Sequence, residues 1–496
     1  MGGKPALQRV ELVEDDALDE SPAPRSRPRG ERRTQPRHAG ARRRRRALLA
    51  GAGVVAVLAF VLIGAQALLD AAYRDRVEAR AHLPGAIDPV GQQAQVRWST
   101  DAAVMDALLM DTPVDGAYVG MRTLPGGVVE ALALDAATGA ARWSRTLRAG
   151  PRQDAAVALG GNACTVSVLP DERDALVCVL TYQPRDERRR PEGARAELVV
   201  LDAATGEPVA RRATAAQAGR LVVSRRTAVV AWRVLGRVHV HAQDLLTGRA
   251  LWDAAFSVPR TGSPSLSSLR AGSRIPRVQL VAGPGGFAVG AGQQVYLLDA
   301  RGRVRPHGRI DGYVRDGRAD RVVVLTLDDG PGTLVVRPGR TPAAVPGVVA
   351  LPSLDDGSLS DVVLTVDTGL RRVEPRSGRP LWTLEGRDSG TVVLDGVVYQ
   401  SGEAAVLRAV DGHSGAVLWS TPATRAAYVT DLVTDGRRLY VALQGLVGAD
   451  TFWLTYGLDG TPLGRLYPPV GWRGPEVRGR ALVAISTDGM RAAVLG

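Results

Sequence analysis

A repeated turn motif constrains this chain more strongly than any other sequence feature. The stretch Val410–Ser420 reads VDGHSGAVLWS, which predicts a strand, a tight turn and a second strand that carries a Trp. The leading Asp can accept backbone N–H bonds inside the turn, and the Gly supplies the positive φ that closes a hairpin. Neither task is catalytic, so the motif is structural. Near-copies occur at Leu134–Ser144, Leu201–Arg211, Asp244–Trp252 and Glu374–Trp382, and shortened copies at Leu298–Val304 and Leu458–Gly464.

The spacing of the turns predicts the architecture. The acidic turn residues run from Asp135 to Asp459, and a degenerate copy at Leu334–Pro342 divides the longest gap. The average spacing is then about 46 residues, within reach of the roughly 40–50 residues of a propeller blade. Other short apolar runs, such as Thr391–Gln400 and Asp435–Leu443, bring each period to about four strands. We predict an all-β fold, a β-propeller of eight four-stranded blades with seven as the alternative; a series of hairpins in a β-sandwich is the competing interpretation.

The repeat resembles that of the pyrroloquinoline-quinone-type, or quinoprotein-like, β-propellers. The shared pattern is Asp-x-x-Thr/Ser-Gly-x-x-x-Trp after an apolar strand, and the resemblance extends from about Ala94 to the end of the sequence. In that family the Trp packs between adjacent blades, and the resemblance implies this role for Trp143, Trp252, Trp382 and Trp419. The corresponding repeat turns are Asp135 and Gly139, Asp202 and Gly206, Asp244 and Gly248, and Asp411 and Gly415. The pattern is broken at Ala210, Pro306 and Ala343, where a Trp is expected.

The chain before the repeats divides into three segments. Residues 1–46 lack apolar periodicity and end in the run Arg42–Arg46, which predicts a disordered basic tail. Residues 47–69 carry no charge and would form a helix of about 34 Å, enough for a hydrocarbon core of about 30 Å. The arginines before this transmembrane helix predict a cytoplasmic tail and an exported remainder. The alternative is a cleaved signal, with Arg45-Arg46 as a twin-arginine start and 65–67 as the cleavage site.

Residues 70–95 are polar and contain breakers such as Pro84-Gly85, so we expect a stalk before a propeller that spans 96–496. The short strand Gln95–Ser99 has no preceding turn. In propellers of this type an N-terminal strand often completes the last blade, which closes the ring and removes open sheet edges. Ala481–Leu495 is the expected partner of this strand.

The charge of the chain gives no sign of a nucleic-acid partner. The formal net charge is +12, and Lys4 is the only lysine among 63 cationic residues, a skew that indicates a GC-rich genome. Half of the net charge lies in residues 1–46, which leaves the remainder only mildly basic. We therefore expect a membrane association through the one helix and no nucleic acid.

The enzymatic site of the quinone-dependent members cannot be mapped onto this sequence. The resemblance implies a disulfide between adjacent cysteines and Asn and carboxylate ligands for Ca²⁺. Here the cysteines are Cys164 and Cys178, and Asn162 is the only asparagine. His239 and His241 share one strand face and could ligate a metal, but no third ligand is identifiable and a polar strand face is the preferred interpretation. We predict no catalytic, cofactor-binding or metal-binding residues and no cofactor.

The segment between the two cysteines reads CTVSVLPDERDALVC, which predicts a hairpin. If the turn is centred on Asp171, Val166 faces Leu176 and Cys164 faces Cys178. Opposed residues of antiparallel strands have Cβ atoms about 4.5–5.5 Å apart, so a small closure permits a disulfide in an oxidising compartment. The alternatives are two buried free thiols, or a turn or bulge that shifts the register and separates the pair.

We expect this chain to be a single-pass protein of the cell membrane whose propeller binds a protein or a cell-envelope component without catalysis of its own. The alternative is an exported oxidoreductase that depends on a quinone or a metal. The ligand itself is not encoded in a readable motif, because recognition by propellers lies in their loops.

Overall fold

The computed structural model describes residues 74–91, 93–148, 163–182, 195–215, 220–234, 236–257, 278–283, 285–318, 321–326, 332–337, 343–360, 362–374, 377–386, 388–402, 406–422, 427–445 and 451–496, together with 64, 66, 68 and 71. The chain forms two compact units, Met1–Ala72 and Tyr73–Gly496. The predicted tail 1–46 and nearly all of the predicted span 47–69 lie outside the described residues. Among the residues that are described, no helix is long and apolar enough to cross a membrane.

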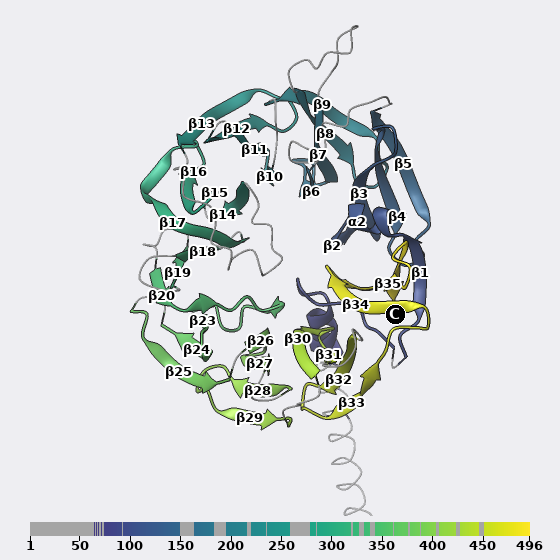
Figure 1. Ribbon diagram of the computed structural model, residues 1–496, viewed down its shortest axis with the longest axis vertical. Helices are drawn as coiled ribbons and strands as arrows, with labels where there is room; N and C mark the ends of the chain where they lie inside the picture. The colour runs from purple at the N-terminus through teal and green to yellow at the C-terminus, as the bar shows by residue number, and fades with distance from the viewer. Residues whose placement is uncertain are drawn as a thin grey trace, which may run out of the picture. The chain divides into compact units, whose positions relative to one another are not determined.

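The second unit is an all-β domain of antiparallel meanders, whose sheets lie side by side around a common centre (Figure 1). Among the described residues, four sheets each contain four strands that follow one another along the chain. The first two are β2 (Leu108–Val114), β3 (Ala117–Thr123), β4 (Val129–Asp135) and β5 (Ala141–Arg148), then β6 (Ala163–Val168), β7 (Asp174–Tyr182), β8 (Arg195–Asp202) and β9 (Pro208–Thr214). The other two are β10 (Arg220–Ser224), β11 (Thr227–Val234), β12 (Arg237–Asp244) and β13 (Ala250–Ser257), then β30 (Ala427–Thr434), β31 (Arg438–Gly445), β32 (Thr451–Gly457) and β33 (Pro462–Leu466).

One sheet has seven strands because two meanders share a strand. Its members are β14 (Gln279–Gly283), β15 (Gly286–Ala291), β16 (Gln294–Asp299), β17 (Val304–Arg318), β18 (Arg321–Thr326), β19 (Gly332–Val336) and β20 (Ala343–Pro346). The first half of β17 pairs with β16 and the second half with β18. The described strands thus form eight hydrogen-bonded sheets but nine four-stranded meanders. The number of blades, expected as eight with seven as the alternative, stays a prediction.

In the next two sheets, a short strand from the chain of the first sheet joins the second. Their members are β21 (Val348–Val349), β23 (Val363–Val366), β24 (Gly369–Val373) and β25 (Pro380–Glu385), then β22 (Leu354–Asp355), β26 (Asp388–Leu394), β27 (Val397–Gly402), β28 (Arg408–Asp411) and β29 (Val417–Ser420). After only two residues of β21 the chain leaves its own sheet and pairs through β22, in parallel, with β26 of the neighbouring sheet. No sequence pattern predicts that β22 joins the neighbouring sheet, because β21 and β22 both read as ordinary short apolar runs.

The last sheet joins the two ends of the domain. It contains β34 (Trp472–Arg478), β35 (Ala481–Ser486), β36 (Arg491–Leu495) and β1 (Val96–Asp101). Strand β1 continues along the chain into the helix α2 (Ala102–Ala107). Strand β1 pairs antiparallel with β36, and Gln95 and Gly496 exchange backbone hydrogen bonds. The predicted pairing of the N-terminal strand with the C-terminal segment is confirmed.

The stretch expected as a stalk differs from that expectation in its second half. Ala86, Ile87 and Val90 are buried, and they pack into the apolar cores beside the sheet β30–β33. The backbone N–H of Ile87 donates to Thr434, which fixes the segment against the turn after β30. The helix-breaking Pro and Gly residues therefore lie in a segment that packs on the domain. The packed domain begins before residue 96.

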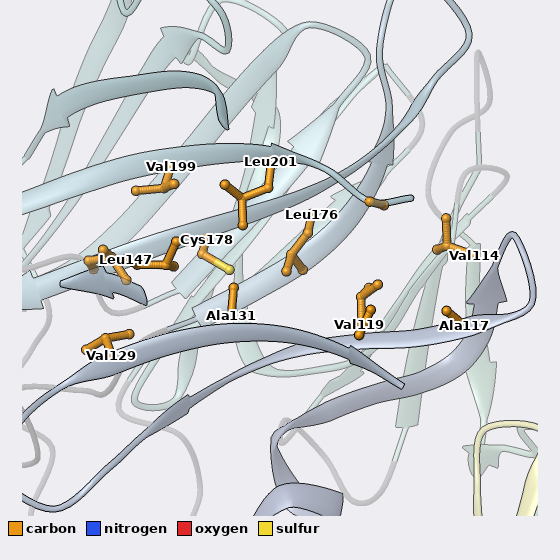
Figure 2. Packing of buried hydrophobic residues seen from close by; sticks show 13 residues of the cluster. Val114, Ala117, Val119, Val129, Ala131, Leu147, Leu176, Cys178, Val199 and Leu201 are labelled. Atoms are coloured by element: carbon orange, nitrogen blue, oxygen red, sulfur yellow. The ribbon is translucent and has the colours of Figure 1, made fainter. Parts of the chain in front are cut away.

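The cores lie between neighbouring sheets. One of them contains Val119 and Ala131 of one sheet and Leu176, Cys178 and Val199 of the next (Figure 2). The middle strands of the sheets, such as β4 and β8, are buried on both faces, so their sequences read as nearly continuous Val, Leu and Ala runs. The outer strands, such as β13, alternate between exposed and half-buried residues. This arrangement gives each sheet two partners.

Candidate interaction surface

The repeat turns have one geometry in four sheets. In the first, Oδ1 of Asp135 accepts the backbone N–H of Ala137 and Thr138 and the hydroxyl of Thr138, at 2.9–3.1 Å. The Gly at the end of the turn has a positive φ, +70° at Gly139. The same bonds form around Asp202, Asp244 and Asp411, with closing glycines Gly206, Gly248 and Gly415.

These hydrogen bonds favour the ionised form of the turn carboxylates. The hydrogen bond from Arg142, followed by those from Thr138, lowers the pKa of Asp135 from 3.8 to about 2. For Asp202, burial acts to raise the pKa, but hydrogen bonds from Thr205 and Ala204 and the charge of Arg173 together lower it. The carboxylates act as structural acceptors of the turns and are not poised for proton transfer at neutral pH.

Each repeat Trp contacts the turn of the following sheet. The indole Nε1 of Trp143 donates to the carbonyl of Ala203 at 3.0 Å, and its ring covers Gly206 so closely that a Cβ there would lie 2.6 Å away. The positive φ and the ring explain together why this turn position is a Gly. Equivalent bonds run from Trp252 to Ala300, from Trp382 to Gly412 and from Trp419 to Leu458.

The structure adds two contacts of this kind that the motif did not reveal. Trp98 of β1 donates to Ala136 and covers Gly139, so the strand that closes the domain carries the same indole contact. Where the pattern is broken at Ala210, the side chain of Arg212 lies over Gly248 and donates to Leu246. Trp98 is followed by a Ser, as Trp143 is, and this shared Trp-Ser pair could have identified Trp98 as a member of the group.

The two cysteines lie in the innermost pair of the sheet β6–β9. Cys164 is the register partner of Cys178, as Val166 is of Leu176, so the predicted register is confirmed. A disulfide joins the cysteines, and Cys178 is fully buried in the core between two sheets. The pair braces two strands at the edge of the core, where Cys164 is half-buried and Cys178 is buried.

The histidine pair has structural partners. His239 stacks on Trp232 with ring centroids 5.4 Å apart, and His241 contacts Asp253 and Gln243 at 2.7 and 3.2 Å. In the part of the chain that the structure describes, no group of three or more His, Cys, Asp or Glu residues could hold a metal ion. Asn162 lies outside the described residues.

A small apolar pocket lies where β21 is short. It is lined by Val335, Val349, Val363 and Leu364, with Arg337 and Asp355 among its polar residues. The backbone next to it is engaged, because Ala350 donates to Leu364 and Val362 donates to Leu359. We assign no chemistry to this pocket.

The two ends of the strands differ. The repeat turns lie at one end of the strands, together with the first turn of each sheet. In the sheet β26–β29, for example, the backbone N–H of Gly412 in the repeat turn donates to the carbonyl of Gly396 in the first turn. The chain enters the domain at this end, because Arg80 pairs with Asp395 and Ala81 accepts a bond from Arg480. We call this the turn end and the opposite one the far end.

The far end of the last two sheets carries a group of exposed apolar side chains. Tyr467 and Val470 follow β33, and Met490 lies in the turn after β35; they are 54, 103 and 70% exposed. The ring of Tyr467 stacks on Phe452 at 5.7 Å. The bond from Thr487 to Gly471 links the two loops, so these side chains belong to one surface, which we call the far-end patch. Sequence reasoning missed the patch because its residues stand outside any motif.

Comparison with known proteins identifies a family. A family profile described as "Outer membrane protein assembly factor BamB" matches residues 86–254 and 366–463, more than half of the chain. A search of curated proteins found no match.

Several solved structures have a similar arrangement of strands. BamB from Moraxella catarrhalis is 16% identical, with 81% of this chain and 99% of that chain covered and a TM-score of 0.38. The computationally designed Ika8 protein is 12% identical, with 83% and 99% covered and a TM-score of 0.35. A europium-containing methanol dehydrogenase is 12% identical, with 74% and 85% covered and a TM-score of 0.33. Nothing further is inferred from these three likenesses.

Proposed function

Because this chain belongs to the outer membrane protein assembly factor BamB family of quinoprotein-like β-propellers, we propose that it is a protein-interaction scaffold of the cell envelope. In this proposal the segment 47–69 is a membrane anchor, the tail 1–46 is cytoplasmic and the propeller is exported. The scaffold binds its partner without catalysis.

The observation that carries the proposal is the difference between the two ends of the domain. The chain from the predicted anchor reaches the turn end, where short hydrogen-bonded turns leave little adaptable surface. The far-end patch exposes Tyr, Val and Met side chains, and aromatic residues and Met are enriched in the centres of protein interfaces. A propeller attached at one end can present the other to a partner.

The oxidoreductase alternative is less favoured by the same residues. The cysteines are paired across a hairpin and not adjacent, and Cys178 is buried between sheets. The turn carboxylates are engaged in hydrogen bonds with their own loops. A quinone would therefore have to use residues other than those that the family's enzymes use.

The topology is tested with reporters fused after Gly496. A reporter that is active only outside the cytoplasm should be active there, and neutral replacements of Arg42–Arg46 should weaken or scramble the orientation. Activity of a cytoplasm-only reporter at the same position would contradict the proposal. For the catalytic alternative, pyrroloquinoline quinone and Ca²⁺ are added to the purified full chain, and a bound-quinone absorption spectrum would overturn the absence of catalysis.

A further inference from the structure

We propose that the far-end patch is the docking site for an acidic partner segment that inserts apolar side chains between two arginines, Arg465 and Arg473. This inference rests on the proposed scaffold function and names its surface and the chemistry of its partner.

The apolar part of the site is accessible. Tyr467 is held by its stack on Phe452 and still leaves about half of its surface exposed. Val470 projects freely, three residues further along the same loop. Trp472 donates to Pro469, which closes the loop on itself and holds these side chains in place. A rigid aromatic beside an exposed aliphatic group is the usual make-up of an interface anchor.

The charge of the site selects the partner. Arg465 lies over the Phe452 ring, 5.9 Å from its centroid, and its guanidinium reaches the Tyr467 hydroxyl at 3.5 Å. The guanidinium of Arg473 reaches the turn that carries Met490, because its Nη2 lies 3.7 Å from the position that a Cβ at Gly489 would occupy. Within the described residues neither arginine has an ion pair. Two cations beside exposed apolar groups favour a partner that brings carboxylates next to apolar side chains.

Asp488, in the turn that carries Met490, forms no ion pair with Arg465 or Arg473 within the described residues. Asp488 accepts the hydroxyl of Ser486 and the backbone N–H of Met490, and the hydrogen bond from Ser486 is the main reason why its pKa is lowered. Its oxygens therefore serve the turn after β35. Recognition by strand addition is less suited to this loop, because Thr487, Trp472 and Met490 already donate their backbone N–H groups within it.

The test uses the full chain in detergent and a fluorescein-labelled peptide, Gly-Asp-Glu-Leu-Phe-Asp-Glu-Gly, followed by fluorescence anisotropy. We expect binding at least about tenfold tighter than that of two counterparts, one with Lys for each acid and one with Ala for Leu and Phe. Val470→Asp and the double variant Arg465→Glu, Arg473→Glu should each weaken binding by about tenfold. Val168→Asp is the matched control, because Val168 is 56% exposed at the turn end, and it should bind as wild type does. Equal binding of the three peptides, no binding, or unchanged binding by the variants overturns the proposal.

A photo-crosslinking amino acid at position 470 or 168, introduced in the native cell, separates this inference from the function on which it rests. Adducts at 470 that disappear in the double arginine variant, formed with a protein whose crosslinked segment is acidic, support the inference. Adducts at 168 alone would overturn the docking site and leave the scaffold function standing. The absence of protein adducts at both positions would count against the docking site, and a cytoplasmic result from the Gly496 reporter would count against the function.

Discussion

Cys164 lies directly opposite Cys178 in the hairpin β6–β7, with 4.1 Å between their Cα atoms, and a disulfide joins them. The two cysteines are separated by 14 positions in the sequence, and for a loop of this size loop-closure entropy predicts a stabilisation of roughly 3 kcal/mol. The variant with both cysteines replaced by Ser should therefore unfold at a lower denaturant concentration. Reductant should destabilise the wild type alone, and two alkylatable thiols in the non-reduced protein would contradict the pairing.

Trp419 provides a test of the contacts between sheets. Its ring lies against Gly460 and its Nε1 donates to Leu458 at 3.3 Å. Trp419→Ala leaves a cavity and should lower the free energy of unfolding by about 3–5 kcal/mol. Trp419→Phe keeps most of the ring but removes the donor, so it should cost less than Trp419→Ala. Urea denaturation of the three proteins measures the order, and an alanine variant as stable as wild type would refute the packing role.

Gly206 and Gly236 form a matched pair of positive-φ glycines, with φ of +72° and +79°. A Cβ at Gly206 would meet the Trp143 ring at 2.6 Å, whereas a Cβ at Gly236 would meet nothing within 4 Å. Gly236→Ala should therefore cost only the left-handed strain of about 1–2 kcal/mol. Gly206→Ala should cost about 1–3 kcal/mol more, because the indole must move. Equal melting temperatures of the two variants would show that the indole does not constrain the turn.

The turn carboxylate of Asp135 makes stability depend on pH. Its pKa in the folded protein is about 2, below the ordinary value of 3.8, so folding favours the ionised form. This contribution is present in full above about pH 5 and is lost as the pH falls through about 2. Asp135→Asn should be less stable than wild type at pH 6, and the difference should shrink toward pH 2. Thermal melts between these values measure it, and a pH-independent difference would exclude the carboxylate as its source.

The repeated turns allowed the all-β class of this protein and the meander order of its strands to be predicted from the sequence. The Asp and the Gly close a hairpin, and the Trp contacts the turn of the following sheet, so each residue acts over a short distance in the structure. The same local logic placed Cys164 opposite Cys178, since the register of a hairpin depends only on its own turn. The pairing of Gln95–Ser99 with the C-terminal segment is not local, and it was predicted from the ring closure that the family resemblance implies, which removes an open sheet edge.

Only the tertiary structure decided the features that depend on distant segments. Arg212 replaces an indole by reaching Gly248, and residues 86–90 pack beside β30–β33 although they read as a linker. The far-end patch joins Tyr467 and Met490 through two separate loops. No local sequence pattern predicts such proximity. Burial and exposure at these positions depend on which strands lie beside one another, and the packing of the sheets around their common centre decides which strands do.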